Sequence, residues 1–134
     1  MIAEINSKEK ELVLDVMVTW SKEFSATNPN SILSLYSQDA SLWGTFSSVV
    51  RGTPESIRDY FVNIFTYANR KVEFNYSNIR FYGDTAISSG QYTFLLGKAG
   101  QELVIPARYS FTYVKQNGSW LIVEHHSSVM PEDL

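Results

Sequence analysis

The stretch that decides the fold is FTYVKQNGSWLIVEHHSS, Phe111–Ser128. Its centre, Asn117-Gly118, is the dipeptide most typical of a two-residue β-hairpin turn, because both residues tolerate the positive φ that a type I′ turn requires. The segments on either side alternate apolar and polar residues, as half-buried strands do. We therefore predict an antiparallel hairpin in which Tyr113 lies opposite Ile122.

An uninterrupted register places Tyr109 opposite His126, and directly opposed side chains share one face of a sheet. The face that carries the aromatic residues also carries His126 and Ser128, and we expect it to look into the protein. One extra residue in the hairpin would reverse this assignment for one strand and bring Arg108 inward in place of Tyr109. The opposite face carries a mixed set: Arg108, Ser110, Thr112, Val114, Leu121, Val123, His125 and Ser127.

The residues before the hairpin divide into a helical half and a strand half. Spacings of three and four predict helices over about 7–27 and about 31–37, and a third begins at Pro54 with Thr53 as its N-cap. The segment 40–52 looks like a strand, a turn and a second short strand. From Lys71 onward the period is two, with Gly90 marking a bend or bulge. The four predicted long strands are 71–82, 85–97, 103–114 and 120–128.

Helices followed by antiparallel strands indicate an α+β fold. We expect a cone-shaped roll, with the N-terminal helices packed on a strongly bent antiparallel sheet and a pocket at the wide end. The 134 residues, 44% of them hydrophobic, suit a single domain spanning 1–134.

Composition excludes several classes of function. The net charge of −3 leaves no basic face for nucleic acid, and the absence of cysteine excludes disulfides and thiolate chemistry. No apolar run approaches the roughly 20 residues that span a membrane, and the charged first residues lack the apolar core of a signal peptide. We therefore expect a soluble, cytoplasmic domain that binds neither nucleic acid nor membrane.

The only two histidines, His125 and His126, are adjacent. Neighbouring residues of a strand point to opposite faces, so this pair cannot ligate one metal without distortion. We expect neither a bound metal nor a cofactor. His126 and Ser128 share a face and can act as base and nucleophile or orient a small ligand, or they can be a core histidine and a strand-end hydroxyl. No nucleophile-elbow motif accompanies them, which argues against acyl transfer.

Two further hydroxyls are candidates for the same pocket. Tyr60 shares a helix face with Ile57, Phe61 and Ile64, so its hydroxyl needs a partner inside the protein. Thr45 follows a predicted strand and can add a hydroxyl at the mouth of the cone. Taken alone, Tyr60 is a core residue and Thr45 a turn residue.

The segments GTPESIRDYF, 52–61, and NGSW…EHHSSVMPE, 117–132, together with the order of elements, resemble the nuclear transport factor 2-like superfamily. Within it the chain looks like the association-domain branch first known from calcium/calmodulin-dependent protein kinase II. The combination of RDYF, HHSS and the following Met-Pro is similar to the iota class of carbonic anhydrases, some of which work without metal.

The iota-class resemblance implies a pocket made by Thr45, Tyr60 and the inward-facing histidine and serine of HHSS, which the register identifies as His126 and Ser128. Tyr109 joins them as a substrate-binding residue on the strength of the pairing. The implied reaction is reversible hydration of CO2 to bicarbonate in a metal-free pocket. Tyr60, Thr45 and Ser128 would hold water and bicarbonate, and His126 would relay a proton; the group that accepts the first proton stays open.

Two other interpretations remain. The resemblance also allows a non-catalytic module for oligomerisation or small-ligand binding, forming a homodimer or a higher homo-oligomer. An isomerase or cyclase of the ketosteroid isomerase kind needs a buried acid as base. Glu124 is the only acid that the register turns toward the pocket, and Phe111 opposite it offers no polar partner, so this interpretation ranks third.

Overall fold

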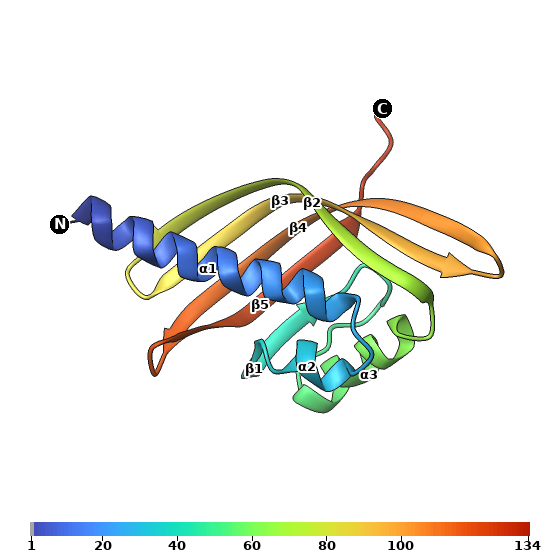
Figure 1. The fold of residues 1–134 in the computed structure, drawn as a ribbon, viewed down its shortest axis with the longest axis horizontal. Helices are drawn as coiled ribbons and strands as arrows, with labels where there is room; N and C mark the ends of the chain where they lie inside the picture. Colours follow the sequence, from blue (N-terminus) through green and yellow to red (C-terminus); the bar gives the residue numbers. More distant parts are fainter. Residues whose placement is uncertain (1) are drawn as a thin grey trace.

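The computed structural model describes residues 2–134, with side chains from residue 7 onward. It is an α+β fold in which helices pack on one curled sheet, as predicted (Figure 1). The helices are α1 (Ile2–Phe24), α2 (Pro29–Leu33) and α3 (Pro54–Ile64). The strands are β1 (Tyr36–Trp43), β2 (Ala68–Tyr82), β3 (Thr85–Lys98), β4 (Gln101–Gln116) and β5 (Ser119–Val129).

The sheet has the order β1-β5-β4-β3-β2. The last four strands form the predicted antiparallel meander, and β1 adds to β5 in parallel. In Figure 1, α1 crosses the sheet while α2 and α3 lie beside β1. None of the helices in residues 2–134 has the length and apolar character that a membrane span requires.

The region of α2 and β1 departs from the prediction. The expected helix over 31–37 ends at Leu33, and Tyr36 already belongs to β1. The backbone amide of Ile122 donates to the carbonyl of Leu35 at 2.9 Å, so pairing with a distant strand overrides the local helical spacing. The expected second short strand reduces to one bridge between Leu42 and Arg51.

Helix α3 begins as the sequence predicts. The Thr53 side chain accepts from the Ser56 backbone amide at 3.1 Å, and Ser56 Oγ accepts from the Thr53 amide at 3.0 Å. This reciprocal capping box, with Pro54 in the first turn, satisfies donors that would otherwise be unpaired. The predicted inner face of the helix is buried: Ile57, Tyr60, Phe61 and Ile64.

Arg70 fixes the end of α1 against the rest of the molecule. Its guanidinium donates to the carbonyls of Phe24 at 3.1 Å, Phe65 at 3.1 Å and Tyr67 at 2.8 Å, and also to that of Ala26. Carbonyls at helix C-termini lack intrahelical partners, so this side chain satisfies several at once. The helix ends at Phe24 and not near residue 27, and the carbonyls of Phe24 and Ala26 at this end bond to Arg70.

The β4–β5 hairpin contains the feature that corrects the predicted site. Tyr113 pairs with Ile122 as expected, but the register then shifts by one residue, so that Phe111 pairs with His125 and Tyr109 with Ser127. The shift is a β-bulge in β5 at Val123 and Glu124. A bulge leaves one residue unpaired and reverses the faces of all residues beyond it.

As a result, the predicted inward orientation of His126 and Ser128 is wrong. Both are exposed, whereas His125 is 3% and Ser127 6% accessible. Because the extra residue lies in β5 and not in β4, Tyr109 remains inside and Arg108 outside.

Glu124 is also displaced from its predicted position. It pairs with Thr112 on the outer side of the sheet, and the expected pairing with Phe111 is taken by His125. The acid that an isomerase of the ketosteroid isomerase kind would need is therefore outside the protein interior.

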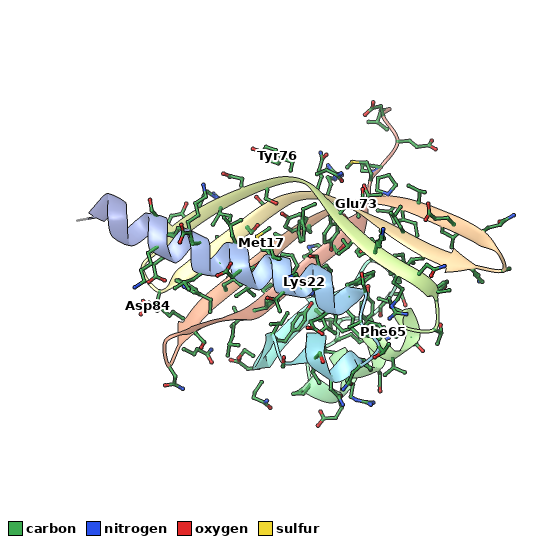
Figure 2. The ribbon with its side chains drawn as sticks, in the orientation of Figure 1. Met17, Lys22, Phe65, Glu73, Tyr76 and Asp84 are labelled. Carbon is green, nitrogen blue, oxygen red and sulfur yellow. The ribbon has the colours of Figure 1, made fainter. Side chains whose placement is uncertain are left out.

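The sheet bends where the sequence predicts. A Cβ on Gly90 would lie 1.9 Å from the carbonyl oxygen of Tyr76 in the neighbouring strand, so only glycine fits. Beside it the β2 register shifts between Phe74 and Tyr76. Figure 2 shows the side chains that fill the layer between α1 and the curved sheet, with Met17 of α1 buried there.

Candidate functional site

A small cavity lies between α1, α3 and the inner face of the sheet. The open space is ≈ 10 Å³ for the centre of a water-sized sphere. That is room for one water molecule or a similarly small molecule. Its walls are Trp20, Phe24, Thr45, Tyr60, Phe61, Ile64, Tyr92, Phe94, His125 and Ser127.

Hydrogen bonds on one side of His125 join its ring to Trp20 through Tyr36. Trp20 Nε1 can only donate, and it donates to Tyr36 Oη at 3.1 Å. The Tyr36 hydroxyl proton is then free to donate to His125 Nδ1, which lies 2.8 Å away. In this arrangement Nδ1 accepts, which is compatible with the proton of the neutral ring residing on Nε2.

Hydrogen bonds on the other side of His125 decide which ring nitrogen carries the proton. Tyr92 Oη donates its single proton to Ser127 Oγ at 2.6 Å. Tyr92 must then accept from His125 Nε2, which lies 3.0 Å away. All the bonds from Trp20 through Tyr36, His125 and Tyr92 to Ser127 thus donate in one direction, toward the cavity.

The cavity end of this chain presents uncharged hydroxyl donors. Ser127 Oγ contacts Thr45 Oγ1, and one of the two protons remains available to a ligand. Tyr60 Oη accepts from the backbone amide of Phe46 at 3.3 Å, which leaves its own proton free. None of the residues lining the cavity is an acid, a lysine or an arginine. The polar wall therefore favours a ligand on which negative charge develops.

Burial keeps the titratable groups of the site neutral. Desolvation, with a smaller effect from the charge of His126, lowers the pKa of His125 to about 3. Desolvation raises the pKa of Tyr60 to about 12, against smaller opposing effects from the Phe46 amide, Thr45 and Arg51. At neutral pH His125 is an uncharged imidazole and Tyr60 a protonated phenol.

Gly44 allows Tyr60 to reach the cavity. A Cβ at this position would lie 2.3 Å from the Tyr60 ring. The ring lies against bare backbone, and the next residue, Thr45, adds its hydroxyl to the same wall.

The structure brings together only part of the predicted set. Thr45 and Tyr60 line the cavity, whereas His126 and Ser128 lie on the outer face, where His126 packs near Trp43 with ring centroids 6.2 Å apart.

Tyr109 is interior but does not line this cavity. Its hydroxyl lies 2.5 Å from Ser77 Oγ and 3.4 Å from Ser88 Oγ, and its ring stacks on Tyr92 with centroids 4.6 Å apart. It therefore supports the ring that holds Ser127.

Sequence reasoning missed three members of the chain: Trp20, Tyr36 and Tyr92. Tyr92 could have been found, because it alternates with Phe94 on the inner face of β3. Tyr36 was assigned to a helix, and Trp20 had no feature that distinguished it from other core residues.

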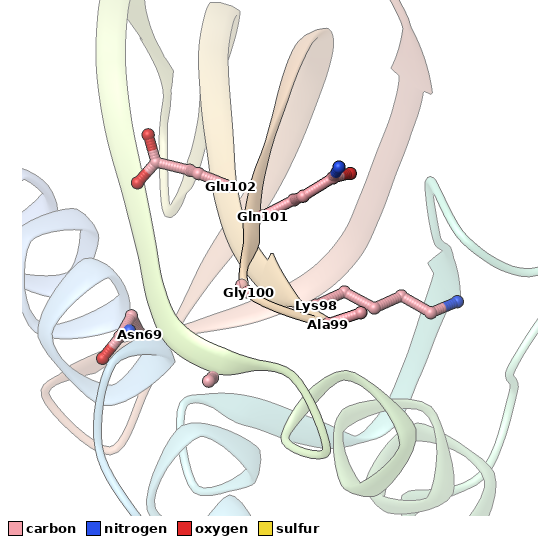
Figure 3. A pocket seen from close by; sticks show the side chains of 8 residues that line it. Asn69, Lys98, Ala99, Gly100, Gln101 and Glu102 are labelled. Carbon is pink, nitrogen blue, oxygen red and sulfur yellow. The ribbon is translucent and has the colours of Figure 1, made fainter.

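The described residues also contain weaker candidates for a functional site. Within them, no three or more His, Cys, Asp or Glu side chains gather closely enough to hold a metal ion. Figure 3 shows a wider hollow at the β3–β4 turn, between Asn69 and the segment 98–102. It is open to solvent, and its polar side chains, Asn69, Lys98, Gln101 and Glu102, point in different directions in Figure 3.

Known proteins match the chain along most of its length. The family model for the calcium/calmodulin dependent protein kinase II association domain matches residues 8–131. A proposed calcium/calmodulin dependent protein kinase II association domain from Xanthomonas campestris is 39% identical, with a TM-score of 0.85 over 90% of this chain and 87% of that one. A search of curated proteins gave no match.

More distant structures share the fold. A nuclear transport factor 2-like superfamily protein from Salmonella enterica is 18% identical, with a TM-score of 0.84 over 95% of this chain and 94% of that one. A proposed scytalone dehydratase from Novosphingobium aromaticivorans is 14% identical, with a TM-score of 0.86 over 96% and 89%. The family model spans nearly the whole chain, which therefore belongs to the calcium/calmodulin dependent protein kinase II association domain family.

Proposed function

We propose that this protein catalyses the reversible hydration of CO2 to bicarbonate, as its resemblance to iota-class carbonic anhydrases implies. The observation that carries the proposal is the convergence of three uncharged hydroxyl groups, those of Thr45, Tyr60 and Ser127, on the inner cavity. The apolar walls, Phe24, Phe61, Ile64 and Phe94, suit uncharged CO2, and a dry surrounding strengthens each hydrogen bond.

The lining of the cavity argues against an isomerase or cyclase of the ketosteroid isomerase kind. No carboxylate lines it to act as the base that such an enzyme needs. One structural neighbour is a proposed scytalone dehydratase. The reverse of CO2 hydration is also a dehydration, because bicarbonate loses water, and the likeness between the two reactions ends there.

In the proposed reaction the oxygen of water attacks the carbon of CO2. An electron pair of one C=O bond moves onto its oxygen, and the water proton leaves to solvent, giving bicarbonate. The developing negative charge is stabilised by hydrogen bonds from Tyr60 and from Ser127 or Thr45. This replaces the stabilisation that a metal provides when it lowers the pKa of water from about 15.7 to about 7.

His125 takes a different part from the one first expected of His126. With its pKa lowered to about 3, it is too weak a base to accept the proton at neutral pH. It donates to Tyr92 instead, and so aligns the hydroxyl that orients Ser127. We assign it as a positioning residue.

Stopped-flow measurement of CO2 hydration tests the proposal. Removal of one oxyanion donor commonly lowers kcat by about 10²–10³, so we expect losses approaching this range for Tyr60→Phe and Ser127→Ala. Ser128→Ala is the matched control, since its hydroxyl is exposed on the other face of β5, and it should keep the wild-type rate. Wild-type activity in Ser127→Ala would reject the assigned site.

Treatment with a chelator tests whether the proposed catalysis is independent of metal. The wild-type rate should be unchanged after incubation with a chelator and dialysis. Loss of activity on that treatment would reject metal-free catalysis. A rate no higher than the uncatalysed rate both with and without the chelator would reject the function itself.

A second candidate is a homo-oligomeric association module without turnover. One observation favours it besides the family: residues on the outer sheet face, including Val114, Leu121 and Val123, are half-buried apolar side chains that no helix covers. Light scattering on the purified protein tests this candidate. A monomer at all concentrations would exclude it, and an oligomer without CO2 hydration would favour it over the enzyme.

A further inference from the structure

A second cavity lies on the other side of Tyr60, open toward solvent. It has a volume of ≈ 270 Å³ and is lined by Phe46, Arg51, Tyr60, Asn63, Ile64, Thr66 and Tyr67. Tyr60 and Ile64 also line the inner cavity. These two side chains are therefore shared by an outer cavity, the vestibule, and the inner cavity.

Arg51 supplies the only charge among the residues that line the vestibule. Its position is fixed at both ends: the backbone exchanges two 2.8 Å hydrogen bonds with Leu42, and Nε donates to Ser47 Oγ at 3.2 Å. Among residues 7–134 no acidic side chain pairs with Arg51, and no hydrogen bond engages its two terminal nitrogens. The guanidinium is also near enough to Tyr60 for its charge to act on that hydroxyl.

We propose that this vestibule is a binding site for a small planar oxyanion, anchored by the Arg51 guanidinium. The guanidinium fork matches the two oxygens of such an anion in a bidentate arrangement. Naming the anion as bicarbonate rests on the proposed function. Asn63 and Thr66 add polar groups on the same wall.

The two cavities differ in charge, because only the vestibule is lined by a cationic side chain. The inner cavity has no cation to hold an anion after it has formed, whereas the vestibule has one directly behind Tyr60. Phe46 lies at the boundary, 40% exposed, with its ring 5.3 Å from that of Phe94 in the inner wall. An anion formed inside thus needs to pass only the shared side chains of Tyr60 and Ile64 to reach the cavity that Arg51 lines.

Titration with bicarbonate, followed by amide NMR at constant ionic strength, tests the site. The amide signals of Phe46, Asn63 and Thr66 should shift in the wild type. Arg51→Gln should raise the Kd at these signals about tenfold or more, because it removes a charge-assisted bidentate contact. Arg51→Lys keeps the charge without the fork and should give an intermediate Kd. Arg108→Gln, an exposed arginine on β4, removes the same net charge and should bind as the wild type does.

Absence of shifts in the wild type, an unchanged Kd in Arg51→Gln, or an equal weakening in Arg108→Gln would each overturn the vestibule. Circular dichroism of each variant confirms that it is folded, and Arg51→Lys provides the comparison if Arg51→Gln is not. Bicarbonate binding that depends on Arg51 in a protein without CO2 hydration would reject the proposed function and leave the vestibule standing. CO2 hydration by a protein whose anion binding does not depend on Arg51 would reject the vestibule and leave the proposed function standing.

Discussion

At the scale of single residues, His125 and His126 show how far position decides chemistry. Their side chains are identical and adjacent, yet one is 3% accessible with its pKa lowered to about 3, and the other is exposed. What distinguishes His125 is its place in a one-directional chain of donors that begins at the indole of Trp20. The bond from Tyr92 to Ser127 sets the direction, because Tyr92 has one hydroxyl proton and must then accept from His125 Nε2.

Nitrogen-15 NMR of the histidine rings tests this direction. In the wild type we expect His125 to be protonated at Nε2 and bare at Nδ1. Trp20→Phe leaves the bond from Tyr92 to Ser127 intact, so His125 should keep its proton on Nε2. Tyr92→Phe removes the acceptor of that proton, so both tautomers should then be populated. His126→Gln simplifies the spectrum and should leave the His125 signals in place. A proton on Nδ1 in the wild type would contradict the assignment.

At the scale of elements, the local signals were reliable and the long-range ones were not. Asn117-Gly118 predicted the hairpin and its first pairs, and Thr53-Pro54 predicted the start of α3, because turns and caps depend on a few neighbouring residues. The bulge in β5 has no such signature, since neither Val123 nor Glu124 is a turn residue. That single unpaired residue reversed the predicted faces of both histidines.

The loop that links β1 to α3 provides an element-scale prediction. Gly44→Ala places a methyl group 2.3 Å from the Tyr60 ring, so α3 or the ring must shift. We expect a loss of about 1–3 kcal/mol in the free energy of unfolding, typical of overpacking, together with slower CO2 hydration. Urea denaturation and stopped-flow assays measure the two effects.

Gly52→Ala, at the other end of the same loop, is the matched control. Its added methyl group would meet no atom within 4 Å, and stability and rate should stay close to the wild type. Equal behaviour of the two variants would contradict the close approach of Tyr60 to Gly44.

At the scale of the whole molecule, periodicity was sufficient for the fold. The change from helical spacing to alternation near Lys71 predicted helices packed on an antiparallel sheet. The addition of β1 in parallel to β5 could not be predicted, because it joins Leu42 to His125 across most of the chain without any local pattern. The site needed this pairing, since it brings Thr45 to Ser127 and Tyr36 to His125.

The buried neutral His125 makes the stability of the whole protein depend on pH. Its pKa falls from 6.5 in the unfolded chain to about 3 in the folded protein, so the unfolded state binds the extra proton. The stabilisation is complete above pH 6.5 and is lost as the pH falls toward 3. Between pH 7 and pH 5 this group alone should reduce the free energy of unfolding by about 2 kcal/mol.

Urea denaturation at pH 7 and pH 5 measures that loss. His126→Gln should retain the acid sensitivity, whereas His125→Asn should lack this part of it, whatever its stability at pH 7. The same pH dependence in both variants would show that His125 is not the titrating group.

Because the two histidines lie on opposite faces of the sheet, His126 is a suitable site for selective chemical labelling. It is the only imidazole that a reagent in solvent can reach without unfolding the protein. A fluorine or nitroxide label attached there would be one residue along the backbone from His125, yet on the opposite side of the sheet. Such a label could report on the cavity through β5 without occupying it.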